Sequence, residues 1–319
     1  MIKKQNYLKH AIVLFLLLLL MQPERAWAAY ENVEFSSLTN HDGLTNSQVG
    51  AILKDTRGYI WFGTQSGLCR FDGFRMKTFY YINTDDKSLP NNSVDELQQD
   101  YGGNIWVHTS VGYCIYKYDE EQFERKPEEW LKNIHVQGPP YKLLIDKDKN
   151  MWIAVYGQGL YYHNAKTKNT YLFKFTKKAQ PGCLKEGNIS KITEVDGDAL
   201  ITYGDGTICR VNGQKQKVLW YNSFLATHKA AGDNGAYTFY DGIGGFWVSV
   251  SNANYVYQSK TGKWTDARSY LTNMGIDIPC PTRILMRDIA RDKAGNLWVA
   301  SDHNGLFFVD FKRKICRQY

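Results

Sequence analysis

The sequence lacks the features that mark a zinc site, a transmembrane protein or a common hydrolase. None of its six cysteines and seven histidines has the short paired spacing of zinc ligands. After residue 21 no segment is apolar enough to cross a bilayer, which takes about 20 such residues. No serine lies in a G-x-S-x-G sequence, and the paired glycines have no phosphate-loop lysine beside them. We therefore expect no metal, no cofactor, no membrane span after the N-terminus and no catalytic site.

The cations are scattered singly along the chain and form no basic stripe. The chain has 39 lysines and arginines against 32 acids, and residues 1–28 hold four of those cations and one of the acids. Without residues 1–28 the balance is 35 against 31, a net charge of +4. Nucleic-acid binding usually needs basic side chains gathered on one face. We expect no nucleic-acid partner.

The first 28 residues are predicted to be a secretory signal peptide. Lys3 and Lys4 precede an apolar run from Ala11 to Met21, and Ala26-Trp27-Ala28 supplies the small residues that a signal peptidase reads. Cleavage is expected before Ala29, which leaves 29–319 as the mature propeller domain proposed below. An uncleaved anchor is the alternative, but the apolar run is too short to span a bilayer. No cysteine follows the signal directly, so a lipoprotein is not expected.

One ten-residue pattern, Asp55 to Thr64, returns along the rest of the chain. The centres lie at intervals of 45, 46, 48, 47 and 51 residues, a period typical of propeller blades. The six centres are Trp61, Trp106, Trp152, Leu200, Trp247 and Trp298. An acid stands six residues before each: Asp55, Asp100, Asp146, Glu194, Asp241 and Asp292. Turn-forming residues such as Gly102-Gly103-Asn104 fill the space between acid and centre.

Each repeat is predicted to form a four-stranded antiparallel sheet. Alternating apolar segments precede and follow the turn, a Gly-led aromatic strand such as Gly67–Phe71 comes third, and a weaker strand such as 170–175 closes the unit. A sheet of this size buries its faces only by radial stacking. The sequence therefore predicts an all-β fold, a β-propeller with six recognisable blades, whose tryptophans wedge between blades and whose acids serve the turns.

The first repeat resembles the propeller repeats of the hybrid two-component sensors of gut Bacteroidetes. The family pattern, roughly dGLsnnsV…il.D..G.iWigT..GL.ryd, matches Asp42–Ser47 through Gly67–Asp72 nearly throughout. The repeats starting at Leu89 and ending at Asp310 match well, whereas the fourth has Leu200 in place of the tryptophan. The fifth lacks the Gly-Leu step. The resemblance covers essentially the whole mature chain.

The resemblance implies a periplasmic sensor module that binds a glycan breakdown product and signals through dimer rearrangement to a histidine kinase. Oligosaccharide is then the expected ligand and a homodimer through the propeller a possible assembly. The kinase of intact relatives is absent from this sequence, so it is expected to be a fragment and not itself an enzyme. The alternative is a freestanding secreted lectin or polysaccharide-active enzyme.

The resemblance also implies seven blades, so the ring is expected to be incomplete. The segment from Glu34 to Leu38 is predicted to be a short strand that could close the ring, although 312–319 already supplies a fourth strand to the sixth blade. Truncation is favoured over a six-bladed closed ring. Exposed edges and an apolar blade face would then lower solubility.

The loops between the second and third strands of the blades are the predicted ligand site, because they converge at one mouth of a propeller and vary between blades. Amide, carboxylate, imidazole and hydroxyl groups there could bind sugar hydroxyls. For any one residue a solvated turn is the simpler interpretation. The candidates are Gln65, His108, Tyr156, Gln158, Asp205, Asn252, Asn254, Asp302, His303 and Asn304.

Two further features have structural interpretations. Cys69, Cys114 and Cys209 share one strand position in three blades and are expected to be buried apolar residues, because equivalent positions are too far apart for disulfides. The pairing of the other three stays open, these being Cys183, Cys280 and Cys316. The long connection 118–140 is expected to contain a helical turn around Glu128–Leu131.

Overall fold

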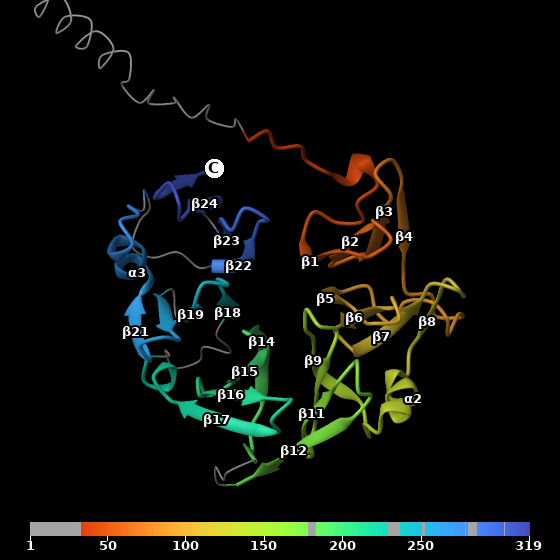
Figure 1. Cartoon of the computed structure of the whole chain (residues 1–319). Helices are drawn as coiled ribbons and strands as arrows, with labels where there is room; N and C mark the ends of the chain where they lie inside the picture. The colour runs from red at the N-terminus through yellow and green to blue at the C-terminus, as the bar shows by residue number, and fades with distance from the viewer. Residues whose placement is uncertain are drawn as a thin grey trace, which may run out of the picture. The chain divides into compact units, whose positions relative to one another are not determined.

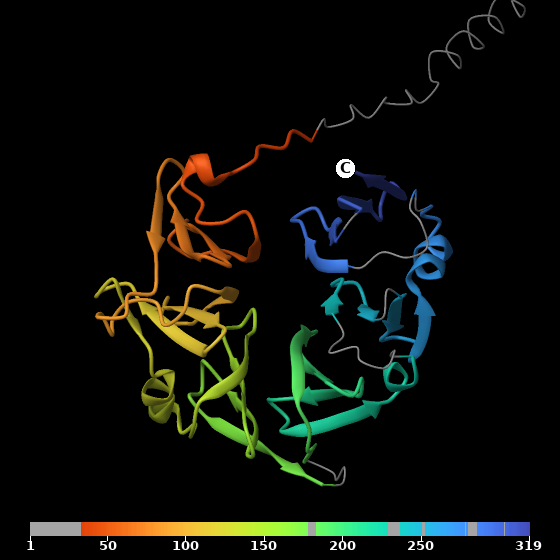
Figure 2. The ribbon, with the colours of Figure 1, turned by 180° about the vertical axis from the view of Figure 1, so that it is seen from behind.

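The computed structural model describes residues 33–177, 183–228, 237–250, 253–277, 279, 286–302 and 304–319. The chain divides into two units, Met1–Leu38 and Thr39–Tyr319. Within the second unit, six antiparallel sheets follow one another in chain order around a common centre (Figure 1), and the view from behind shows the same succession (Figure 2). The predicted all-β propeller of six four-stranded blades is confirmed.

Each sheet is one blade, and its strands neighbour one another in sequence order, from the inner strand to the outer one. Blade 1 consists of β1 (Val49–Lys54), β2 (Ile60–Thr64), β3 (Gly67–Phe71) and β4 (Met76–Phe79). Blade 2 consists of β5 (Val94–Gln99), β6 (Ile105–Thr109), β7 (Gly112–Lys117) and β8 (Gln122–Glu124). Blade 3 consists of β9 (Pro140–Ile145), β10 (Met151–Val155), β11 (Gly159–His163) and β12 (Thr170–Thr176), with the short β13 (Leu184–Lys185) parallel to β12.

The last three blades repeat this order. Blade 4 consists of β14 (Ile189–Val195), β15 (Asp198–Tyr203), β16 (Ile208–Asn212) and β17 (Lys217–Asn222). Blade 5 consists of β18 (Tyr237–Tyr240), β19 (Gly245–Val250), β20 (Ala253–Gln258) and β21 (Lys263–Asp266). Blade 6 consists of β22 (Met286–Arg291), β23 (Leu297–Ser301), β24 (Leu306–Asp310) and β25 (Ile315–Gln318).

The few helices lie in the connections. The helical turn predicted around Glu128–Leu131 is confirmed as α2 (Pro127–Leu131), which has proline in its first turn and is followed by the 3-10 helix η2 (Lys132–Ile134). The helix α3 (Ala267–Asn273) was not predicted; its N-cap Asp266 accepts a hydrogen bond from the Ser269 amide. Two more 3-10 turns are η1 (Asn40–Asp42) and η3 (Leu225–Thr227).

The turn between the second and third strands is set by glycine. In blade 3, Gly159 has φ +147°, and a Cβ built there would lie 2.1 Å from the carbonyl oxygen of Phe173 on the neighbouring strand. No other residue fits where two backbones approach this closely. In blade 3 the glycine that begins the third strand is therefore a requirement of the backbone.

Each blade packs on the next through one kind of interface. The face that carries the repeat centre, here called the tryptophan face, lies against the opposite face of the following blade. Trp61 and Leu68 of blade 1, for example, share a core with Ile105 and Val107 of blade 2. Equivalent cores join blades 2 to 3, 3 to 4, 4 to 5 and 5 to 6. Trp106 and Trp152 are each 1% exposed, and the predicted wedging between blades is confirmed for these two and for Trp61 and Trp247, but not for Trp298.

The two end blades each have a face that no sheet covers among the described residues. On the opposite face of blade 1, Leu44, Phe62 and Cys69 form a small core of their own, and Ile52 is 66% exposed. On the tryptophan face of blade 6, Trp298 and Phe308 are only half-buried. The described part of the chain shows no shared core between blades 6 and 1, and whether the ring has a seventh blade stays a prediction.

The prediction of a strand from Glu34 to Leu38 is wrong. Residues 33–39 have no regular secondary structure, and none of the six sheets includes them. A strand forms only where a partner supplies its hydrogen bonds, and β25 already occupies the outer position of blade 6, as predicted for 312–319. The predicted signal peptide lies outside the described residues, and no described helix is long and apolar enough to cross a membrane.

Candidate functional site

The acid of five of the six repeats is engaged by its own turn. Asp55 Oδ1 accepts the backbone N–H groups of Arg57 and Tyr59 at 2.9 and 3.0 Å, and its Oδ2 accepts the indole N–H of Trp61 at 2.7 Å. The hydroxyl of Tyr118 also donates to Oδ2. The same bond from indole to carboxylate measures 3.1 Å at Trp106, 3.4 Å at Trp152, 3.0 Å at Trp247 and 3.4 Å at Trp298. The prediction that the acids serve the turns is confirmed for these five aspartates.

Blade 4 departs from this arrangement, because Leu200 has no N–H group to offer a carboxylate. Its first turn shrinks to Asp196-Gly197, both with positive φ, at 52° and 82°. The expectation that Glu194 stands in the turn is therefore wrong: it lies within β14, opposite Ala199. Glu194 instead accepts the backbone N–H of Lys147 at 2.8 Å and pairs with the Lys147 ammonium at 3.2 Å. Glu194 is thus released from the framework role, and Asp196 of the shortened turn is a second carboxylate near it.

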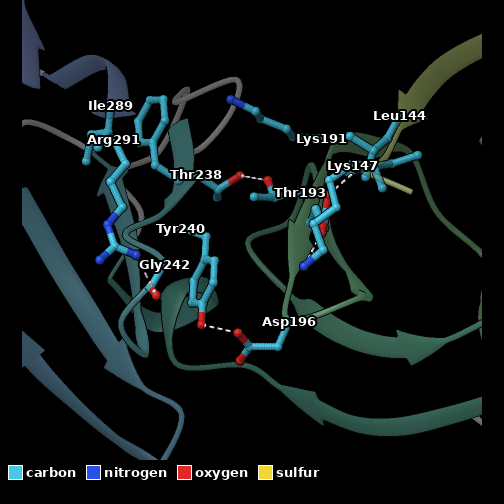
Figure 3. Close-up of a pocket in the computed structure, with 13 residues that line it drawn as sticks. Leu144, Lys147, Lys191, Thr193, Asp196, Thr238, Tyr240, Gly242, Ile289 and Arg291 are labelled. Carbon is cyan, nitrogen blue, oxygen red and sulfur yellow. Dashed lines mark hydrogen bonds and ion pairs between the residues drawn. The ribbon is translucent and has the colours of Figure 1, made fainter. Parts of the chain in front are cut away.

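Glu194 and Asp196 line a cavity of about 540 Å³ among the inner strands of blades 3 to 6 (Figure 3). Its walls come from the second halves of β9, β14, β18 and β22 and from the turns that follow them. It therefore lies toward the end of the central channel opposite the predicted loops. The lining residues are Leu144, Lys147, Lys191, Ile192, Thr193, Glu194, Asp196, Thr238, Phe239, Tyr240, Gly242, Ile289 and Arg291. We call this cavity the channel pocket.

Hydrogen bonds between blades 4 and 5 fix part of the pocket wall. The hydroxyls of Thr193 and Thr238 share a hydrogen bond of 2.9 Å across the blade interface. The Tyr240 hydroxyl donates to Asp196 Oδ1 at 2.5 Å, as drawn in Figure 3. Burial, together with this bond to a carboxylate, raises the pKa of Tyr240, so the phenol is neutral at physiological pH. The pocket thus presents hydroxyl and carboxylate groups in fixed positions.

Lys191 is positioned by an irregularity in β14. The register between β14 and β15 shifts between Ile189 and Lys191, a β-bulge that re-aims the side chains after it. Lys191 and Thr193 then share the tryptophan face of blade 4, and the Lys191 ammonium lies 4.5 Å from the centre of the Phe239 ring of blade 5. Desolvation lowers the pKa of Lys191, and the nearby carboxylates of Asp288 and Glu96 only partly oppose this. Within the described part of the chain, its ammonium has no hydrogen-bond or ion-pair partner.

Arg291 forms the opposite wall. Its Nη1 donates to the carbonyl oxygen of Gly242 at 3.0 Å, and its Nε donates to that of Gly295 at 3.2 Å. Both acceptors are neutral, so the guanidinium charge is held in place without being cancelled. Figure 3 shows Lys191 and Arg291 on different inner strands around the same space.

Eight of the ten predicted site residues are described by the structure, and none of these eight lines the channel pocket. Gln65 accepts a hydrogen bond from Ser93 at 2.9 Å, and Gln158 donates to the Gln137 carbonyl at 2.8 Å. The others that lie in turns or bends are Tyr156, Asp205, Asp302 and Asn304. Two are strand residues, so their placement in loops is wrong: His108 lies in β6 and Asn254 in β20. Asn252 and His303 lie outside the described residues.

The predicted residues form small local groups. Tyr156 is 68% exposed and stacks on Tyr141 at 3.9 Å. His108 Nδ1 lies 2.5 Å from Asp95 Oδ1. Asp205 pairs with Lys185 at 2.5 Å, and Asp302 with Arg287 at 2.9 Å. Asp205 and Asp302 thus each have a cationic partner.

Cysteine and metal chemistry have no support in the described structure. Cys69, Cys114 and Cys209 are buried and form no disulfide, as predicted, and burial raises the pKa of the Cys209 thiol to about 12. Cys183 and Cys316 are half-buried, and Cys280 lies outside the described residues. No group of three or more His, Cys, Asp or Glu side chains suited to a metal occurs among the residues that the structure covers.

Comparison with known proteins gave one family match and several similar structures. Residues 43–66 match the model of the two component regulator propeller, and a search of curated proteins found no match. The extracellular domain of the putative hybrid two component system BT3049 from B. thetaiotaomicron is 21% identical, with a TM-score of 0.60, over 89% of this chain and 36% of that one.

Two other solved structures are similar at lower identity. The extracellular domain of the putative one component system BT4673 from B. thetaiotaomicron is 16% identical, with a TM-score of 0.58, over 89% of this chain and 39% of that one. PorZ, a surface component of the type-IX secretion system of Porphyromonas gingivalis, is 12% identical, with a TM-score of 0.54, over 86% of this chain and 32% of that one.

The likeness to these structures is one of fold, and this chain spans less than two fifths of the length of each. The sequence match and the fold nevertheless agree, since the matched residues run from the entry of blade 1 through β1 and β2. The chain thus carries a two-component regulator propeller repeat and has the propeller fold of the extracellular domains of B. thetaiotaomicron two-component systems.

Proposed function

We propose that this chain is an exported ligand-binding propeller of a two-component sensor and that the channel pocket binds an oligosaccharide released from a glycan. The observation that supports the proposal most strongly is the composition of the pocket wall. Hydroxyl, carboxylate and ammonium groups from four consecutive blades face one space of about 540 Å³, a volume typical of small-ligand sites.

The pocket suits a sugar because its polar groups occur with apolar surface. Hydroxyl groups of a sugar both donate and accept hydrogen bonds, and Thr193, Thr238 and Asp196 offer matching partners. The apolar patches of a sugar ring can lie against Ile192 and Ile289. Because the wall combines β14 with β18 and β22, a ligand would contact three blades at once and could change how they pack.

In this proposal the chain binds and does not catalyse. The pocket's two carboxylates are engaged by Lys147 and Tyr240, so neither is free to act as the acid or base of a glycosidase pair. In this proposal residues 1–28 are a signal peptide that directs export, and a homodimer through the propeller transmits binding to a kinase. The kinase partner, the dimer and the periplasmic location belong to the proposal.

The test is titration calorimetry of the purified chain with a panel of neutral and acidic oligosaccharides of two to six sugars. We expect saturable binding of at least one member with no change in its length after incubation. Thr193→Val with Thr238→Val should weaken that binding, whereas the exposed Thr167→Val should not. Absence of binding across the panel, or cleavage of the sugars, would contradict the proposal.

A further inference from the structure

The channel pocket holds more positive than negative charge. Its lining includes three cations, Lys147, Lys191 and Arg291, against two carboxylates, Glu194 and Asp196. Lys147 pairs with Glu194, and Asp196 is bound by a neutral phenol. Lys191 and Arg291 are therefore the two cations of the pocket that have no carboxylate within ion-pair distance among the described residues.

The environment of Lys191 costs the protein free energy, since an ammonium taken out of water without an anion partner is unfavourable. An ordinary structural lysine would extend to solvent or pair with an acid. Lys191 instead lies over the Phe239 ring, inside the channel, and desolvation lowers its pKa. The carboxylates of Asp288 and Glu96 act on it only from beyond ion-pair distance. A bound anion would supply the missing partner.

Arg291, at the end of β22, adds a second positive charge to the pocket wall. Its Nε and one Nη nitrogen hold the carbonyl groups of Gly295 and Gly242, which fixes the plane of the guanidinium. The other Nη nitrogen has no hydrogen bond among the described residues. A fixed guanidinium with free N–H groups is well suited to bind a carboxylate.

We propose that the ligand of the channel pocket is an acidic oligosaccharide, with the carboxylate of a uronic acid bound by Lys191 of β14 and with Arg291 of β22 adding positive charge to the same pocket. This inference rests on the proposed function and narrows its ligand class. The sugar hydroxyls then face Thr193, Thr238 and Asp196. A uronic acid is favoured over a free inorganic anion because the pocket also offers these hydroxyl partners and apolar wall.

The experiment compares matched probes by calorimetry. The protein is titrated with trigalacturonate or diglucuronate and, separately, with neutral oligomers of the same length. Acetate and sulfate serve as anions without a sugar. We expect an acidic oligomer to bind at least about tenfold more tightly than its neutral counterpart, which corresponds to one charge-assisted contact. The difference should shrink as ionic strength rises from 0.05 to about 0.5 M because salt screens the attraction.

Variants identify the residues. Lys191→Met should abolish the preference for the acidic probe, and Lys191→Arg should retain most of it. Lys215→Met, at an exposed lysine in the turn before β17, is the matched control and should leave the preference unchanged. Circular dichroism of each variant separates loss of binding from loss of fold.

The outcomes distinguish the two proposals. Neutral oligomers that bind as tightly as acidic ones, or an acidic preference that survives Lys191→Met, would overturn the charged-ligand inference and leave the sensor proposal standing. Binding of acetate or sulfate as tight as that of the acidic oligomer would overturn the sugar component. If no probe binds, both proposals fail.

Discussion

Trp152 and Trp298 are matched residues, and replacing each by alanine tests whether another blade covers its tryptophan face. Each indole N–H lies 3.4 Å from the carboxylate of its own repeat, Asp146 or Asp292. Each ring also contacts one aromatic ring of its own blade closely, Tyr162 at 4.5 Å for Trp152 and Phe308 at 4.8 Å for Trp298. The contacts within the blade are therefore alike, and the two positions differ in what lies on the far side.

The far side of Trp152 is covered by blade 4, whereas no sheet covers Trp298 among the described residues. The pKa values of the two repeat acids show the same contrast. Desolvation raises the pKa of Asp146, whereas at Asp292 desolvation is outweighed by hydrogen bonds from Asn296 and the pKa is lowered. The pair of substitutions therefore isolates the contribution of one blade interface.

Trp152→Ala should cost about 3–5 kcal/mol of unfolding free energy, the usual range for a fully buried tryptophan. A buried aromatic side chain removes about 150–250 Å² from water. If one face of the Trp298 ring is uncovered, about 80 Å² of that area stays exposed, and the side chain stabilises the fold by about 2 kcal/mol less at 25 cal/mol per Å². Trp298→Ala should therefore cost about 1–3 kcal/mol. Both changes lose one hydrogen bond to a carboxylate, so this loss cancels in the comparison.

Urea denaturation followed by circular dichroism measures both costs, and the slopes of the transitions must agree for the comparison to hold. Equal costs for the two substitutions would refute the account, because they would mean that the tryptophan face of blade 6 is covered as fully as that of blade 3. Trp298→Ala costing more would refute it as well.

Two other predictions concern the interior of blade 3. His163 is 1% exposed, its Nδ1 is hydrogen-bonded to Thr170 and its Nε2 has no partner, and burial lowers its pKa from 6.5. Stability that is present above pH 6.5 should therefore be lost as the pH falls through and below that value. His163→Gln should flatten this dependence of Tm on pH, whereas His41→Gln, at an exposed histidine, should not. An unchanged slope in His163→Gln would contradict the assignment. Gly159→Ala should lower the free energy of unfolding by several kcal/mol because its Cβ would meet the Phe173 carbonyl. Gly157→Ala has open space around the new Cβ and should cost only about 1 kcal/mol, for its positive φ. Equal denaturation midpoints for the two variants would show that the two backbones do not approach as described.

The fold could be predicted from the sequence because the repeat encodes its own geometry. Asp55 accepts a hydrogen bond from the indole of Trp61, six positions later. The spacing seen in the sequence is therefore the spacing of a contact in the structure. The strand at 34–38 could not be predicted reliably. Strand formation there depends on a partner edge that no local pattern specifies, and β25 already occupies the outer edge of blade 6.

The channel pocket was missed for a related reason. Sequence reasoning favoured the variable turns, but His108 and Asn254 lie in strands, and the described turn residues are tied into local pairs. The useful signal was the break in the repeat at Leu200, which shortens the turn and releases Glu194. Which side chains then line the same pocket depends on the bulge before Lys191 and on the relative placement of β14 and β22. The spacing of residues in the sequence predicts neither.

The most direct test of the account is amide hydrogen exchange, measured with and without the oligosaccharide that binds most tightly. The account predicts slower exchange in β14 and β18 and in the turns after them, around residues 191–196 and 238–242, with the second-strand turns at Gln65 and Tyr156 unchanged. Protection confined to those turns would place the ligand at the other mouth of the propeller and contradict the channel pocket as the binding site.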